Sequence, residues 1–255
     1  MAYEHHVYNN DREMTQNESF SLAKIFLYMF AGLTITAIIA FGLAAFYRFI
    51  FQIDSDLGID ANLENAASLV LIILLILSVI GIIVLSIVVP ITVARGRHSV
   101  LAPMIIYTIL MGIMLSTIAI FVPWYLLGIT FFITALIFGF MSLIALLSKS
   151  RLNGLVIVAI GLFIGAGLIS LFLWILMITL PAGTVTWLYW VVMLAVFAGM
   201  MLITIWDIAR IKRIAMNGEM TNNLSLYCAF ILYNDFINIL LRVLRILVLL
   251  FGKSK

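Results

Sequence analysis

The stretch LSLYCAFILYNDFINILLRVLRILVLLF, residues Leu224–Phe251, has the length of a membrane span but carries polar side chains along it. These side chains are Asn234, Asp235, Asn238, Arg242 and Arg245. An ionised carboxylate in hydrocarbon is costly, so such a residue normally faces a bundle interior or a water-filled cavity and has a partner there. We therefore expect Asp235 to lie inside a bundle of helices, and we expect this span to be the most buried one.

The composition of the whole chain identifies the class of protein. The chain is 65% hydrophobic and only 10% charged, whereas soluble domains are about a quarter charged. It is therefore an integral membrane protein whose first partner is the lipid bilayer, and its basic residues form no nucleic-acid-binding run. Because a span needs about 20 residues, we expect a polar cytoplasmic tail at residues 1–23, one membrane domain at residues 24–251 and a C-terminal tail at residues 252–255.

Seven apolar runs predict an all-α protein with seven membrane spans. They are Lys24–Ile50, Ala66–Val93, Val100–Val122, Trp124–Leu147, Gly154–Leu180, Trp187–Trp206 and Leu224–Phe251. The third and fourth runs are separate spans because the uncharged interval between His98 and Lys149 is too long for one crossing. Pro123 at its centre breaks a helix, and Trp124 suits the membrane interface.

The distribution of Lys and Arg predicts the orientation, because cytoplasmic loops carry the excess of basic residues. The second, fourth and sixth connections contain Arg95 and Arg97, Lys149 and Arg151, and Arg210, Lys212 and Arg213. The other connections, near residues 57, 123 and 183, contain no Lys or Arg. The N-terminus is therefore expected in the cytoplasm and the C-terminus outside, although Lys253 and Lys255 run against this. The short tails favour a prokaryotic cytoplasmic membrane over an endomembrane.

Asp207 and Asp235 lie on either side of the turn Met216–Asn223, at similar distances from it. Residues equidistant from the turn of an antiparallel helix hairpin lie at the same height, so the two carboxylates can meet inside the bundle. Two carboxylates in contact in a low-dielectric interior share one proton, which makes a pH-sensitive pair.

A second interpretation is that each aspartate has its own basic partner. In that arrangement Asp207 pairs with Arg210 or Arg95, Asp235 pairs with Arg242, and both bridges are purely structural. Asn234 and Asn238 add polar lining beside Asp235 in either case.

Four stretches carry a resemblance to a known family. They are LYNDFINILLRVLR at Leu232–Arg245, FLYMFAGLTITAIIA at Phe26–Ala40, FFITALIFGFMSL at Phe131–Leu143 and WDIARIK at Trp206–Lys212. In this order they resemble the closing signature, the first span, the fourth span and the usual Tyr-Asp motif of the transmembrane Bax-inhibitor family. The closing signature is the most specific of the four, and the resemblance covers most of the chain.

The resemblance implies seven spans with the last one central, and a pH-regulated calcium leak. In such a leak Asp207 and Asp235 match the paired aspartates and would be tentative calcium ligands. Arg95 or Arg97 matches the arginine that latches onto the first aspartate. No cofactor is implied, and calcium is the transported ion. Three departures from the family pattern are Asn234 in place of an apolar residue, Trp206 in place of tyrosine, and Met111-Gly112 where many members carry a glutamate.

Two other classes of function compete with a calcium leak. The family also includes non-conducting regulators that bind a membrane protease or other membrane proteins, and such a regulator would have the same helices. An intramembrane aspartyl protease also needs two aspartates on neighbouring spans. It expects Gly-x-Gly-Asp at the second aspartate, where this chain has Tyr233-Asn234-Asp235, so we do not expect an enzyme.

Overall fold

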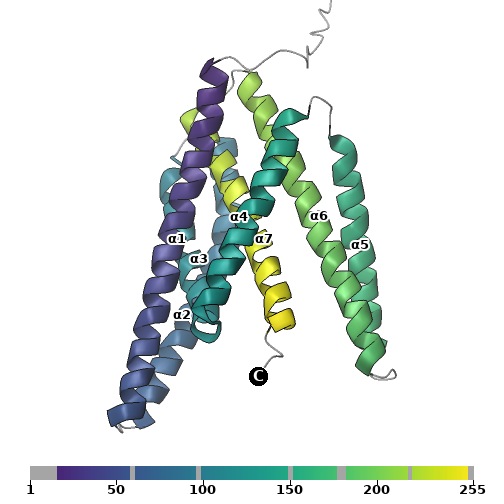
Figure 1. Ribbon diagram of the computed structural model, residues 1–255. Helices are drawn as coiled ribbons and strands as arrows, with labels where there is room; N and C mark the ends of the chain where they lie inside the picture. Colours follow the sequence, from purple (N-terminus) through teal and green to yellow (C-terminus); the bar gives the residue numbers. More distant parts are fainter. Residues whose placement is uncertain are drawn as a thin grey trace, which may run out of the picture. The chain divides into compact units, whose positions relative to one another are not determined.

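A computed structural model describes residues 16–57, 61–95, 99–148, 152–176, 182–217 and 220–251, and these residues form seven α-helices (Figure 1). The helices are α1 (Gln16–Leu57), α2 (Ala61–Arg95), α3 (Leu101–Phe121), α4 (Trp124–Leu147), α5 (Asn153–Leu176), α6 (Ala182–Met216) and α7 (Asn222–Phe251). The first six contain segments long and apolar enough to cross a membrane. The prediction of an all-helical membrane protein with seven helices is confirmed.

The helices differ from the predicted spans mainly at their ends. Helix α1 begins at Gln16, within the predicted polar tail, and continues to Leu57. Helix α6 continues to Met216, so Arg210, Lys212 and Arg213 lie on its last turns and not in a loop. Helices readily extend past the apolar part of a span, because their own backbone hydrogen bonds are satisfied in water as well as in lipid. The break at Pro123 is where the sequence predicted it, with α4 beginning at Trp124.

The chain divides into two compact units, and the division falls inside α1 and α4. The first unit comprises residues Met1–Leu22 and Leu136–Glu219, and in it α5 and α6 pack side by side (Figure 1). The ring of Phe163 lies against Gly199, where an added Cβ would be 3.2 Å from its Cζ. A glycine on α6 therefore lets the two helices approach closely.

The second unit comprises Ala23–Ala135 and Met220–Lys255, and α7 is the helix that joins its parts. Side chains of α7 contact α1, α3 and α4, and its backbone also runs close to α2. At the start of α7, Lys24 Nζ donates a hydrogen bond to Asn222 Oδ1 at 2.7 Å. Thirteen of the 30 residues of α7 are buried, against seven of 21 in α3. This packing agrees with the expectation that the last span is the most buried one.

The predicted orientation can be tested by cysteine labelling, because the single natural cysteine, Cys228, is buried. In a Cys228→Ala background, we expect Leu57→Cys to react with a membrane-impermeant maleimide from outside. Arg151→Cys should react only from the cytoplasmic side, since basic loops are cytoplasmic. Labelling of both positions from the same side would disprove the predicted topology.

Candidate ion site

The polar side chains of α7 form one stripe along the helix. Asp235, Asn238, Arg242 and Arg245 follow one another at spacings of three or four residues, so they share a face. This face is the less buried side of α7: Asp235 and Arg242 are half-buried, and Asn238 and Arg245 are exposed. A polar stripe on a helix of a membrane protein belongs against a bundle interior or water rather than lipid tails.

The opposite side of α7 is fixed to α1 and α3 by buried hydroxyl groups. The hydroxyl of Thr36 donates to the carbonyl oxygen of Thr108 at 3.0 Å. The hydroxyl groups of Thr36 and Tyr233 lie 2.7 Å apart. A hydroxyl has a single proton to donate, so in this arrangement Tyr233 donates to Thr36. Three helices are thus joined by one chain of hydrogen bonds.

Asn234 is held by the same cluster of residues. Its Oδ1 accepts a hydrogen bond from the Tyr107 hydroxyl at 2.7 Å, and the Tyr107 ring packs edge-on against Phe230 at 4.8 Å. The asparagine that departs from the family pattern therefore has a partner on α3. An apolar side chain at this position would leave the Tyr107 hydroxyl without this acceptor, at a cost of about 1–3 kcal/mol if it stays buried.

The absence of a glutamate at Gly112, the second residue of Met111-Gly112, has a steric explanation. A Cβ at Gly112 would lie 2.8 Å from Ile39 Cβ and 3.0 Å from the carbonyl oxygen of Thr36. Helices α1 and α3 are so close at this point that no side chain fits. Gly112 of this chain therefore cannot be exchanged for a carboxylate on an ion path without moving α1 away from α3.

Asp207 lies on α6, in the first unit, and is only 9% exposed. Arg210 lies one turn further along α6, three residues from Asp207. The guanidinium of Arg210 also lies 5.4 Å from the centre of the Trp206 ring. Charged side chains three residues apart on a helix are neighbours, so Arg210 stays a candidate charge partner of Asp207, which was one of the two interpretations of the sequence. The direct pairing of Asp207 with Asp235, which belongs to the other unit, stays a prediction.

One of the two latch candidates lies at the end of α2. Arg95 is the last residue of the helix, as expected for the end of a span, but its side chain is outside the described part of the structure. Arg97 lies outside the described residues altogether. The choice between them therefore stays a prediction.

Comparison of the sequence with models of known protein families identifies the family of this chain. The family model described as "Inhibitor of apoptosis-promoting Bax1" matches residues 19–253. The chain belongs to the Bax inhibitor family. Neither a curated protein nor a solved structure matches it.

Membership confirms the resemblance found in the four sequence stretches and the multi-pass membrane fold. Bax inhibitor proteins are generally membrane proteins without enzymatic activity. Within the described residues, no group of three or more His, Cys, Asp and Glu side chains is placed to hold a metal ion. Asp207 and Asp235 stay predicted ligands of a passing ion.

Sequence reasoning missed Arg48, which lies near the end of the first apolar span. Its Nη2 donates to the carbonyl oxygens of Ala119, Ile120 and Val122 at 2.7–3.0 Å, and its Nε donates to Ile120 at 3.2 Å. These carbonyls belong to the end of α3 and the turn after it, where helices leave acceptors unsatisfied. An arginine two residues from the end of a span, together with the interfacial Trp124, was the available signal.

Proposed function

We propose that this Bax inhibitor protein is a pH-sensitive calcium leak. In this proposal Asp207 and Asp235 form the pH-sensing pair, and Arg95 or Arg97 is the latch that holds α2 over the path. Calcium is cargo, and no cofactor takes part. The membrane is a prokaryotic cytoplasmic membrane, with the N-terminus of the protein in the cytoplasm.

The observation that carries the proposal is the polar stripe of α7. Calcium needs six to eight oxygen ligands. Asp235 and Asn238 present oxygens along the stripe, Asn234 lies beside it, and Asp207 would add a second carboxylate. Water and backbone carbonyls supply the remaining ligands. The amide of Asn234 already accepts from Tyr107, so Asn238 is the asparagine that is better available to a passing ion.

Calcium flux into liposomes tests this function. We expect the wild-type protein to pass calcium increasingly as the pH falls from about 8 to about 5, the range over which a coupled carboxylate pair takes up its second proton. Asp235→Asn should lose this pH dependence, because a lone aspartate has no coupled titration. The matched control is Glu18→Gln, which removes a carboxylate of α1 outside the stripe and should behave like the wild type.

Reconstituted wild-type protein that passes no calcium anywhere in this pH range would contradict the proposal. It would favour the other class found within the family, a non-conducting regulator that binds a membrane protease or other membrane proteins. Equal loss of pH dependence in Asp235→Asn and Glu18→Gln would contradict the assignment of pH sensing to the carboxylate of α7.

A further inference from the structure

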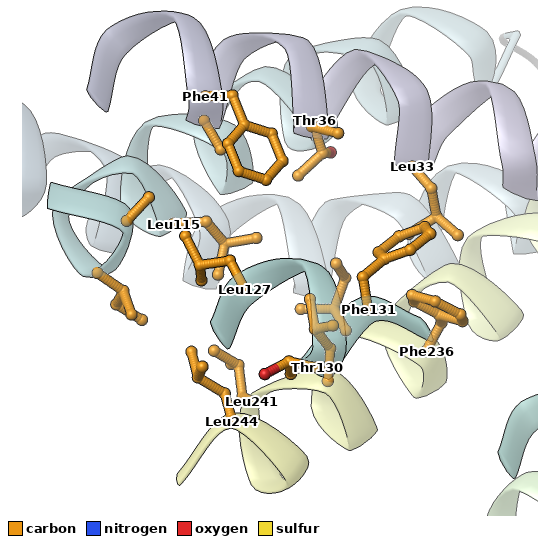
Figure 2. Close-up of a pocket in the computed structure, with 16 residues that line it drawn as sticks. Leu33, Thr36, Phe41, Leu115, Leu127, Thr130, Phe131, Phe236, Leu241 and Leu244 are labelled. Carbon is orange, nitrogen blue, oxygen red and sulfur yellow. The ribbon is translucent and has the colours of Figure 1, made fainter. Parts of the chain in front are cut away.

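The second unit contains an apolar cavity of about 80 Å³ between α1, α3, α4 and α7 (Figure 2). Its wall includes Thr36 and Phe41 of α1, Ala119 of α3, Thr130 of α4 and Phe236 of α7. Nearly all of the remaining wall is leucine, isoleucine and alanine.

The cavity is large enough for water but unsuited to it. A buried water needs two to four polar partners, and the only hydroxyl groups in the wall belong to Thr36 and Thr130. The Thr36 hydroxyl is bonded to Thr108 and Tyr233, and the Thr130 hydroxyl donates to the Leu126 carbonyl at 2.7 Å. Cavities of this kind stay dry and accept apolar groups.

The cavity adjoins a surface that suits a lipid. Phe41 and Phe131, which line it, are 41% and 45% exposed. Phe41 stacks on Trp124 at 5.4 Å, and Trp124 begins α4 just after the turn at Pro123. Tryptophan at the end of a span is typical of the headgroup region of a bilayer.

A cationic group lies beside the same wall. The Arg48 guanidinium is 4.6 Å from the centre of the Trp124 ring, and its Nη2 bonds the carbonyl of Ala119, a residue of the cavity wall. Arginine has five N–H donors. The bonds that Arg48 makes to described residues come from Nε and Nη2, which leaves Nη1 for a further acceptor.

We propose that this is a binding site for one phospholipid. The phosphate of the lipid accepts hydrogen bonds from Arg48 at the membrane interface, and one acyl chain enters the apolar cavity. The two halves of the site match the two halves of a phospholipid. Arg48 Nη1 offers a charge-assisted donor to one phosphate oxygen, and the two hydroxyl groups in the cavity wall are already bonded within the protein. The inference is independent of the proposed calcium leak.

The test is native mass spectrometry of the full-length protein, released from detergent after incubation with a defined lipid. We expect one retained phosphatidylglycerol. Diacylglycerol with the same chains lacks the phosphate, and glycerol 3-phosphate lacks the chains, so we expect each to be retained about tenfold less. Equal retention of diacylglycerol would show loosely bound surrounding lipid, and retention of glycerol 3-phosphate alone would show a plain anion site. Either result would overturn the proposal.

A variant that fills the cavity separates the site from the rest of the lipid-facing surface. Ala40→Leu places a larger apolar side chain in the wall and should lower retention of phosphatidylglycerol about tenfold, the effect of excluding roughly two methylenes. Its control is Ala45→Leu, at an exposed position of the same helix outside the cavity, which should retain the lipid normally.

Arg48→Gln should also lose the lipid. Because Arg48 bonds the carbonyls at the end of α3, this variant is a valid test only when its helical circular dichroism equals that of the wild type. Ala40→Leu leaves Arg48 in place, and Ala37→Leu is the substitute that fills the same cavity from the next turn. A folded cavity-filling variant that retains as much phosphatidylglycerol as Ala45→Leu would disprove the site.

Discussion

Asp207→Asn should leak calcium at neutral pH at the rate that the wild type reaches only in acid. In the proposed mechanism the aspartate pair holds one proton and a net charge of −1, which Arg95 or Arg97 neutralises. Acid adds the second proton and removes the partner of the arginine. A buried charge that loses its partner costs about 3–5 kcal/mol, so the arginine moves into cytoplasmic water and releases α2. The substitution removes the same charge without acid.

The measurement is calcium flux in liposomes at about pH 5 and about pH 8, the two ends of the expected titration. Wild-type flux should be high only at the lower pH, and Asp207→Asn flux should be high at both. Asp235→Asn should stay mostly closed at both values, because Asp207 keeps its charge and the latch keeps its partner. The two substitutions are thus expected to affect calcium flux at neutral pH differently: Asp207→Asn raises it and Asp235→Asn does not. Purely structural roles for both aspartates would not produce this difference.

Arg210→Gln tests whether Arg210 of α6, instead of Arg95 or Arg97, is the arginine that neutralises Asp207. Arg210 lies one turn from Asp207 on the same helix, so it is the alternative to Arg95 and Arg97 as the charge partner of Asp207. We expect Arg210→Gln to remain closed at neutral pH and to open in acid. Opening of this variant at neutral pH would assign the latch to Arg210. An Asp207→Asn protein with the pH dependence of the wild type would contradict the gating mechanism itself.

The helices could be predicted from the sequence because the bilayer imposes a simple rule. Apolar runs of about 20 residues become helices there. The predicted break at Pro123 between α3 and α4 is confirmed. Helix ends were less predictable, because a helix can continue into water with polar residues on it, as α1 does at Gln16 and α6 does at Arg213. Hydropathy marks the membrane, whereas capping and packing decide where a helix ends.

The polar face of α7 was also predictable in part. Asp235 and Asn238 share a face by spacing alone, and the structure extends this face to Arg242 and Arg245 on the less buried side of the helix. Asn234 was expected to line the same path, but its amide is bonded to Tyr107. The partner lies more than a hundred residues away, and no local pattern identifies a hydrogen bond between distant helices.

The contacts that hold the second unit together were not visible in the sequence. Thr36 and Arg48 lie in an ordinary apolar span, and the sequence alone does not distinguish them from residues without a structural role. Their roles depend on the carbonyls that α3 presents to them, and these are backbone atoms that no side-chain pattern records. Gly112 is a similar case, because a glycine in an apolar helix shows its purpose only when the neighbouring helix is known.

Gly112→Ala should destabilise the protein, although alanine favours a helix over glycine by about 1 kcal/mol. The new Cβ would lie 2.8 Å from Ile39 Cβ, 2.9 Å from Ile39 Cγ2 and 3.0 Å from the carbonyl oxygen of Thr36. The first and last of these atoms are on or next to the backbone of α1, so α1 must move. Overpacking of this kind costs about 1–3 kcal/mol, and Gly112→Leu should cost more than Gly112→Ala.

The reaction of Cys228 with a thiol-reactive dye during heating reports this loss of stability, because the only cysteine is 1% exposed in the folded protein. We expect the apparent Tm of Gly112→Ala to fall by several degrees, since about 1 kcal/mol corresponds to about 2–4 °C in a protein of this size. Gly42→Ala on α1 is the matched control, because an added Cβ there meets nothing within 4 Å. Its Tm should be unchanged or higher. Equal Tm values for the two variants would mean that α1 and α3 do not meet at Gly112, and the hydrogen bond from Thr36 of α1 to the Thr108 carbonyl of α3 would then lose its structural basis.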